Sequence, residues 1–262
     1  MRVDTHNHTI YCNHASGSMN EYIQRAIRLG IDIFGFSCHA PMEFDKKYRM
    51  SAEILPLYLQ QIQDLKKNYI GQIEILSALE VDFILGRENL LLDSVINADV
   101  DYLIGSVHFL DDWGFDNPEF VGRWKSFGET KAWDKYLDSM QEMAKSRLFQ
   151  IAGHFDLPKI FGNFMPQSLA SKCGETLEIL HQNDMILEIN AAGLRKNVGE
   201  AYPSLNVLNL AREIGLDITL SSDAHDVSQV GFGYETCLNL AKKAGYNKAA
   251  IFRKKKKDYV EI

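Results

Sequence analysis

Short apolar runs alternate with amphipathic stretches along the whole chain. Each run is rich in Ile, Val, Leu and Phe and has few polar interruptions, which is typical of strands buried on both faces of a parallel sheet. We predict seven such strands: Arg2–Thr5, Asp32–Ser37, Ile73–Glu80, Asp101–Val107, Phe149–Gly153, Met185–Asn190 and Asp217–Ser221.

The stretches between these strands have the spacing of amphipathic helices. The predicted helices are Asn20–Leu29, Pro56–Tyr69, Ala132–Lys145, Gln167–Gln182, Leu205–Ile214 and Tyr234–Ala244. A strand–helix unit repeated in this way indicates a parallel sheet. About seven units in 262 residues favour a closed barrel over an open doubly wound sheet. We therefore expect one α/β domain over residues 1–262, with Lys254–Lys257 as a solvated basic tail.

Composition and charge narrow the class of protein. The chain is 46% hydrophobic and has a net charge of −7, which gives no general attraction to nucleic acid or an anionic membrane. No apolar run approaches the roughly 18 residues of a membrane span, and the first residues lack the apolar stretch of a signal peptide. We expect a cytoplasmic enzyme that acts on a small molecule, with neither nucleic acid nor membrane as partner. The sequence leaves its oligomeric state open.

The four cysteines form no CxxC motif and no dense framework, which favours reduced thiols. Cys12 and Cys38 lie beside histidines that are candidate metal ligands. A small residue in the core is the favoured interpretation of each. Metal binding by either one stays open.

Seven of the eight histidines lie where a predicted strand ends, and two acidic residues join them there. In β/α proteins active sites are built at the C-terminal ends of the strands. Neutral imidazole and carboxylate are ligands for Zn, Mn and Fe, and the sequence does not choose among the three. The candidate ligands are His6, His8, His14, His39, Glu80, His108, His154, Asp223 and His225.

The spacing and number of these ligands suggest a cluster of ions. Side chains two residues apart on an extended strand point the same way, so His6 and His8 can hold one ion together, as can Asp223 and His225. Nine candidates are too many for one tetrahedral ion, and two or three ions are expected. Clustered divalent ions favour hydrolysis of a phosphate ester. Glu188 could be a further ligand. The favoured alternative is that its carboxylate hydrogen-bonds a histidine or arginine of the site and does not contact an ion itself.

Six motifs together resemble the polymerase-and-histidinol-phosphatase (PHP) superfamily, in the expected order from residue 4 to about residue 233. They are Asp4-Thr-His-Asn-His8, Ser37-Cys-His39-Ala-Pro, Glu80, Ser106-Val-His108, Gly153-His154-Phe-Asp156 and Ser222-Asp-Ala-His225. The resemblance implies a distorted (β/α)7 barrel with a trinuclear site at the C-terminal ends of the strands. It assigns one ion to His6, His8, Glu80 and Asp223, a second to Glu80, His108 and His154, and a third to His14, His39 and His225.

Three segments resemble more closely the monofunctional histidinol-phosphate phosphatases of this superfamily. They are Gly105–Asp116, Gly153–Lys159 and Asn190–Ser204. This resemblance implies hydrolysis of L-histidinol phosphate to L-histidinol and inorganic phosphate, a step of histidine biosynthesis. Two alternatives stay open. One is the same fold acting on another phosphoester, such as a phosphotyrosine peptide or a nucleotide, and the other is a metal-binding module without catalysis.

The longest predicted connection, from Phe109 to about Thr130, carries aromatic and acidic residues. Trp113 and Asp116 are candidates for binding the imidazole and ammonium of histidinol, and a self-packed surface loop is an equal alternative. Arg195 and Lys159 each follow a strand end, which favours contact with phosphate oxygens.

The expected mechanism is in-line attack on phosphorus by a hydroxide that bridges two metal ions. Arg195 is expected to stabilise the charge on the phosphoryl oxygens. Asp156 lies two residues beyond His154 and would share its face if the strand continues there. It could then orient the hydroxide or pass a proton to the leaving group.

Overall fold

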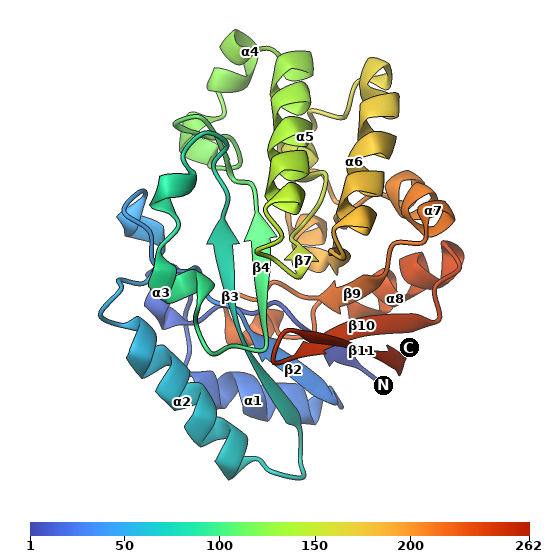
Figure 1. Ribbon diagram of the computed structural model, residues 1–262. Helices are drawn as coiled ribbons and strands as arrows, with labels where there is room; N and C mark the ends of the chain where they lie inside the picture. The colour runs from blue at the N-terminus through green and yellow to red at the C-terminus, as the bar shows by residue number, and fades with distance from the viewer.

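Seven parallel strands form the central sheet of the computed structural model, which describes residues 1–262 (Figure 1). Their order across the sheet follows their order in the chain. They are β1 (Val3–Asp4), β2 (Ile33–Phe36), β3 (Glu74–Asp82), β4 (Tyr102–Ser106), β7 (Ile151–Ala152), β8 (Ile186–Asn190) and β9 (Ile218–Ser221). All seven predicted strands are present, and every neighbouring pair is parallel.

The two outer strands of this sheet also meet, so the sheet is nearly closed. The amide of Thr5 donates to the carbonyl of Leu220 at 3.1 Å, and the amide of His8 donates to that of Ala224 at 2.9 Å. Asn7 and Ala224 form a parallel bridge at the same seam. The predicted barrel of seven β/α units is therefore confirmed.

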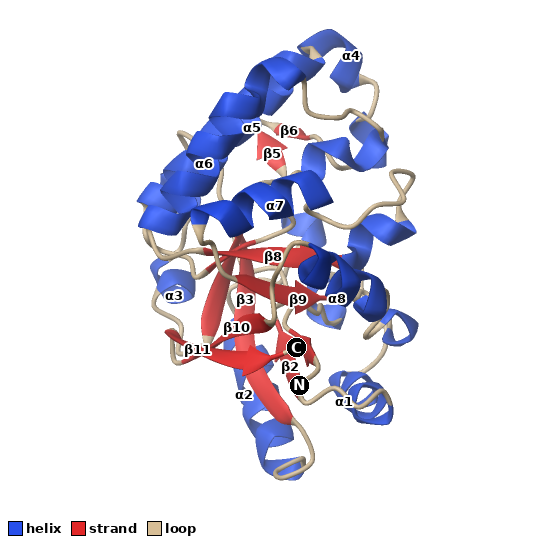
Figure 2. Ribbon diagram, turned by 90° about the vertical axis from the view of Figure 1, so that its right-hand side faces the viewer, coloured by secondary structure: helices blue, strands red, loops and turns tan.

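Eight α-helices surround the strands (Figure 2). They are α1 (Met19–Arg28), α2 (Leu55–Asn68), α3 (Asp93–Ile96), α4 (Arg123–Phe127), α5 (Glu129–Lys145), α6 (Ala170–Gln182), α7 (Leu205–Ile214) and α8 (Tyr234–Lys243). Short 3-10 helices lie at Ile10–Cys12, Lys46–Tyr48, Glu88–Leu90, Pro118–Phe120, Leu157–Phe161, Gln167–Leu169, Ala191–Arg195 and Val227–Gln229. None of the helices is both long and apolar enough to span a membrane.

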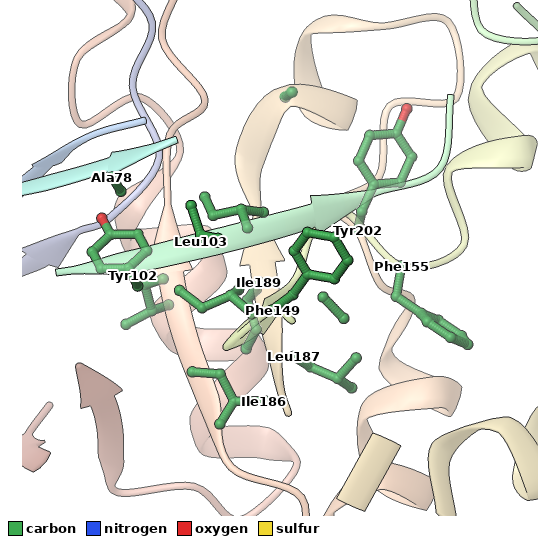
Figure 3. Close-up of a cluster of buried hydrophobic side chains, with 14 of the residues drawn as sticks. Ala78, Tyr102, Leu103, Phe149, Phe155, Ile186, Leu187, Ile189 and Tyr202 are labelled. Carbon is green, nitrogen blue, oxygen red and sulfur yellow. The ribbon is translucent and has the colours of Figure 1, made fainter. Parts of the chain in front are cut away.

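The core lies on both faces of the strands. Every residue of β2, β4, β8 and β9 is buried, which explains their nearly continuous apolar sequences. Figure 3 shows part of this core, with Leu103, Phe149, Phe155, Ile186, Leu187 and Ile189. A Cβ atom at Gly105 would lie 2.7 Å from Met143 Sδ, so glycine allows α5 to pack closely on β4.

Two β-hairpins were not predicted. The first, β5 (Phe109–Leu110) with β6 (Trp113–Gly114), lies in the long connection after β4. The second pairs β10 (Lys248–Arg253) with β11 (Lys256–Glu261). Lys254–Lys257 are exposed, as predicted, but they belong to this hairpin, so the prediction of a tail is wrong. Lys254 and Lys255 form the turn of this hairpin, and their amides donate to Asp101 at the start of β4.

Candidate metal centre

All nine predicted ligands lie at one end of the barrel, in or just beyond the C-terminal parts of the strands. His6 and His8 follow β1, His39 follows β2, Glu80 lies in β3, His108 follows β4, His154 follows β7, and Asp223 and His225 follow β9, while His14 follows the 3-10 turn at Ile10–Cys12. Because the sheet closes on itself, residues more than 200 positions apart in sequence become neighbours. Asp223 Oδ1, for example, lies 3.2 Å from His8 Nε2.

Glu80 lies at the middle of this group, with 1% of its surface exposed. Its Oε1 atom is 2.9 Å from His154 Nε2 and 3.6 Å from His108 Nε2. Its Oε2 atom is 3.4 Å from His6 Nε2 and 3.5 Å from His8 Nε2. The two oxygens therefore face two different sets of imidazoles, which is the geometry a bridging carboxylate needs.

Donor atoms converge into several groups whose members lie within 4.8 Å of one another. Four of the five groups are His6, His8 and Glu80; Glu80, His108 and His154; His8, His39 and His225; and Cys12, His14 and His225, and the fifth is His8, Cys12 and Cys38. The first two correspond to the first two predicted ion positions and share Glu80. The three residues predicted to hold the third ion do not form one group. His39 and His225 group with His8, whereas His14 and His225 group with Cys12.

The buried polar atoms of the site fit divalent cations. Glu80 Oε2 and Asp223 Oδ1 are buried, and the imidazole nitrogens closest to them are His39 Nδ1 at 2.9 Å and His8 Nε2 at 3.2 Å. Buried carboxylate oxygens and imidazole nitrogens at such distances can bind a divalent ion together, and these donors suit Zn, Mn or Fe.

The electrostatics of the site hold Glu80 and His39 in the protonation states that metal ligands need, whereas they raise the pKa values of His6, His8 and His108 and favour the protonated imidazoles. Burial raises the pKa of Glu80, but the charges of His39 and His6 outweigh burial and hold it well below its ordinary value. Burial lowers the pKa of His39 to about 4. Burial also lowers the pKa of His8, yet the hydrogen bond to Asp223 raises it to about 9. His8 must therefore release a proton when an ion binds.

Carboxylates behind the histidines fix the orientation of their rings. Glu188 Oε1 lies 2.7 Å from His6 Nδ1, and Glu188 Oε2 accepts the amide of His154 at 2.7 Å. Asp82 Oδ1 likewise lies 2.6 Å from His108 Nδ1. In the Glu188–His6 and Asp82–His108 pairs the carboxylate contacts Nδ1 of the imidazole, so Nε2 can bind a metal ion. Glu188 thus has the supporting position that the sequence favoured.

Sequence reasoning missed Asp82 and Arg49. The buried guanidinium of Arg49 donates to Asp82 Oδ2 at 2.8 Å. Asp82 could have been found, because it lies two residues after Glu80 on the same strand and so on the same face. Arg49 follows a short turn at Lys46–Tyr48, where no periodic pattern marks it.

A cavity of about 610 Å³ opens onto the centre. Its size is within the usual range for a small-molecule site. Eight of the nine predicted metal ligands line it, all except His6. The connection after β4 contributes Phe109, Asp116 and Phe120, and the connection after β8 contributes Ala192 and Arg195.

Two predicted substrate residues, Asp116 and Arg195, therefore line the cavity. The guanidinium of Arg195 donates to the carbonyls of Ser222 at 2.9 Å and Asp223 at 2.7 Å. Two of its five N–H donors are used in this way, and the others remain for a ligand. Arg195 also ties its own connection to the segment that carries Asp223.

Lys159 does not line the cavity. It is only 2% exposed, and its ammonium lies 2.8 Å from Glu200 Oε2, 2.9 Å from the carbonyl of Ala201 and 3.1 Å from Asp156 Oδ2. All three donors of the ammonium have protein partners. Its predicted contact with phosphate is not supported by this placement.

Asp156 also lies outside the cavity. It was expected to share the face of His154 if the strand continued there, but the strand does not continue. The strand ends at Ala152, and His154 and Asp156 have φ angles of 26° and 68°. The alternation of side chains along a strand therefore does not apply to them. The Asp156 carboxylate accepts the amide of Ser204 at 2.9 Å, and burial raises its pKa to about 6.

Trp113 is 1% exposed and packs within its own connection. Its ring centroid lies 5.0 Å from those of Trp124 and Phe127. The self-packed alternative thus describes these three residues, whereas Phe109 and Phe120 of the same connection line the cavity. The structure does not bring Trp113 to the proposed substrate.

Comparison with known proteins agrees with this arrangement. The family model described as "PHP domain" matches residues 4–192. The chain is 36% identical to the "Probable histidinol-phosphatase" of Deinococcus radiodurans, over 97% of both chains. It is 31% identical to the "Histidinol-phosphatase" of Bacillus subtilis, over 90% of this chain and 97% of that protein.

A solved structure shares the fold. The histidinol phosphate phosphatase of Lactococcus lactis, crystallised with zinc, L-histidinol and phosphate, superimposes with a TM-score of 0.83. The likeness covers 98% of each chain at 22% sequence identity. With the family model matching most of the chain and a relative above 30% identity along nearly all of it, the chain belongs to the PHP domain family.

Proposed function

We propose that the protein hydrolyses L-histidinol phosphate to L-histidinol and inorganic phosphate with the help of three divalent metal ions. The observation that carries the proposal is the position of Glu80, shared by two groups of buried imidazoles beside a cavity lined by Arg195 and Asp116. Relatives named as histidinol-phosphatases at 31% and 36% identity support the choice of substrate. So does the solved relative from Lactococcus lactis, which holds L-histidinol and phosphate.

In this proposal the nine predicted ligands hold the ions. His6, His8, Glu80 and Asp223 would bind one, Glu80, His108 and His154 a second, and His14, His39 and His225 a third. When bound, such ions supply a nucleophile near neutral pH and neutralise charge on phosphoryl oxygens. Glu188 and Asp82 keep the imidazoles of His6 and His108 turned toward the ions.

Three basic residues line the cavity, Arg49, Arg195 and Lys196, and we assign the phosphoryl group to Arg195. It lines the cavity beside Asp223, and its guanidinium is held by two backbone carbonyls. A fixed planar donor loses little freedom when it binds an oxyanion, so it can stabilise the charge that develops in the transition state. Lys159 and Asp156 do not contact the cavity. Their side chains hydrogen-bond the backbone of Ala201 and Ser204 and so hold that segment in place.

The leaving group would lie against the connection after β4. Asp116 presents a carboxylate to the cavity, and the rings of Phe109 and Phe120 line it nearby. A carboxylate and aromatic faces suit the ammonium and imidazole of histidinol. Asp45 and Glu119 add negative charge to the same wall.

A panel of phosphoesters compared by kcat/KM tests this assignment. The metal-loaded protein is assayed with L-histidinol phosphate, p-nitrophenyl phosphate, a phosphotyrosine peptide and a nucleoside monophosphate. We expect histidinol phosphate to be the best substrate by at least about tenfold, an advantage of ~1.4 kcal/mol in the transition state. Equal values for p-nitrophenyl phosphate would refute the substrate and leave the phosphatase chemistry standing. No turnover of any ester would favour a metal-binding module.

A further inference from the structure

Two cysteines outside the predicted ligand set lie directly against it. Cys12 and Cys38 are both fully buried and both free. Their sulfur atoms converge on the same residue, since Cys12 Sγ lies 3.1 Å and Cys38 Sγ 3.6 Å from the carbonyl oxygen of Thr9. The hydroxyl of Thr9 also donates to Cys38 Sγ at 3.2 Å.

His8 completes this group. The two sulfurs and one ring nitrogen of His8 lie within 4.8 Å of one another. The Nε2 atom of His8 faces the proposed ions, 3.1 Å from His6 Nε2 and 3.2 Å from Asp223 Oδ1. Its Nδ1 atom is buried and has no hydrogen-bond partner. That unpartnered nitrogen is the one left for the sulfurs.

We propose that Cys12, Cys38 and His8 form a buried site for one thiophilic metal ion, such as Zn²⁺ or Cd²⁺, beside the proposed centre. Two thiolates and one imidazole are a common donor set for tetrahedral zinc, and thiolates select soft ions over hard ones. The carbonyl of Thr9 is the nearest oxygen for a fourth position. Binding of the ion releases to solvent the two thiol protons and the proton that His8 Nδ1 carries.

An ion can reach this site from the cavity. Cys12 Sγ also lies within 4.8 Å of donor atoms of His14 and His225. Both histidines line the cavity, and His14 is exposed. The sulfur of Cys12 therefore lies behind the outermost imidazoles of the centre, within reach of an ion that these imidazoles have already captured.

The other two cysteines provide matched controls. Cys173 in α6 and Cys237 in α8 are also buried and free, at 2% and 1% exposure. Neither belongs to any group of converging donor atoms. Substitution of either one removes a buried thiol without touching the proposed site.

Cobalt(II) is the probe, because thiolate bound to cobalt gives a charge-transfer absorption in the near ultraviolet. Reduced protein is loaded with cobalt(II) to saturation, and the spectrum and the cobalt content are recorded. We expect the band in the wild-type protein and its loss in Cys12→Ser and Cys38→Ser. We also expect the Cys12→Ser/Cys38→Ser double variant to bind one cobalt ion fewer per chain, whereas Cys173→Ser and Cys237→Ser keep both the band and the ion.

Absence of the band from fully loaded, reduced wild-type protein overturns the proposal, and this arm requires no variant to fold. Persistence of the band in the Cys12→Ser/Cys38→Ser double variant overturns it as well. The absorption band and the cobalt content are both measured without phosphatase activity. Failure of this proposal can therefore be distinguished from failure of the proposed substrate.

Discussion

At the scale of single residues, Glu80 has the largest expected effect on metal binding. Its two oxygens face different imidazoles, at 2.9 Å from His154 Nε2 and 3.4 Å from His6 Nε2. Glu80→Gln removes the negative charge and replaces one carboxylate oxygen with an NH2 group, which does not bind a cation. We expect the loaded variant to lose two of about three ions, as measured by elemental analysis.

His14→Asn is the comparison for that variant. His14 is the most exposed of the proposed ligands and contributes to one ion only. We expect this variant to lose a single ion. Equal metal content in Glu80→Gln, His14→Asn and the wild-type protein would show that Glu80 is not a bridge.

Arg195→Met should lower kcat/KM for histidinol phosphate. A charge-assisted hydrogen bond contributes about 1.5–3 kcal/mol, which corresponds to roughly a 10- to 150-fold loss. The contacts of Arg195 with the carbonyls of Ser222 and Asp223 could also loosen an ion, so metal content is measured on the same samples. Arg212→Met on the surface of α7 should keep wild-type kinetics. Wild-type kcat/KM in Arg195→Met would remove Arg195 from the mechanism.

The convergence of the candidate ligands could be predicted from the sequence better than the positions of the charged residues around them. The ligands could be predicted because a strand end has a defined direction and the barrel brings these ends together. Lys159 and Asp156 also follow a strand end, but each pairs with residues about 40 or more positions away, at Glu200 and Ser204. A long side chain near a predicted site can turn to such a partner, and no local pattern shows that it does.

At the scale of elements, the connection after β4 is expected to set substrate preference through Asp116. Asp116→Asn removes the negative charge that would face the cation of histidinol. We expect kcat/KM for histidinol phosphate to fall about tenfold, or ~1.4 kcal/mol, with p-nitrophenyl phosphate unaffected. The control is Asp112→Asn, on the same connection but outside the cavity, where Asp112 pairs with Arg123. A parallel loss for both esters would assign Asp116 to the metal centre instead.

The hairpin of β10 and β11 closes the opposite end of the barrel through Asp101. Asp101 Oδ2 accepts the amide of Ser77 and the ammonium of Lys66, both at 2.8 Å, and Oδ1 accepts the amide of Lys254. Asp101→Asn should lower the free energy of unfolding by about 1–3 kcal/mol at neutral pH, measured by urea denaturation. Catalysis should not change.

The same variant should show a defined pH dependence. Burial raises the pKa of Asp101, but hydrogen bonds from Lys66 and Ser77 outweigh it and hold the pKa below the ordinary 3.8. The folded protein thus binds this proton less tightly than the unfolded chain, so the stabilisation exists above pH 3.8 and is lost as the pH falls below it. The difference in the free energy of unfolding between Asp101→Asn and the wild-type protein should therefore disappear below pH 3.8. Asp99 is an exposed neighbour, and Asp99→Asn should have the stability of the wild-type protein. A difference between Asp101→Asn and the wild-type protein that persists in acid would contradict the proposed role of the Asp101 carboxylate.

Regular elements could be predicted where a repeated pattern marks them. The seven core strands have such a pattern, since burial on both faces demands a continuous apolar run. The turn of the last hairpin lacks one, because Lys254 and Lys255 have φ angles of 51° and 62° where Asn and Gly are the usual signal. The four basic residues therefore resembled a tail, whereas pairing of β10 with β11 and the contact with Asp101 hold Lys254 and Lys255 in a turn.

At the scale of the whole molecule, closure of the sheet creates the site. β1 and β9 lie at opposite ends of the chain, and their pairing places Asp223 beside His8. Helix and strand counting from the sequence was sufficient to predict this closure. The lining of the cavity could not be predicted in the same way, because it depends on how the irregular connections after β4 and β8 fold over the centre.

The most direct test of the account is the release of phosphate from L-histidinol phosphate by one preparation in two states, fully metal-loaded and chelated. The proposed ligands converge in groups that share Glu80, and bound ions would supply the nucleophile, so catalysis should require them. We predict turnover by the loaded protein, loss of turnover on chelation, and recovery when zinc, manganese or iron is returned. Turnover that survives complete chelation, or a fully loaded protein that releases no phosphate, would contradict the account.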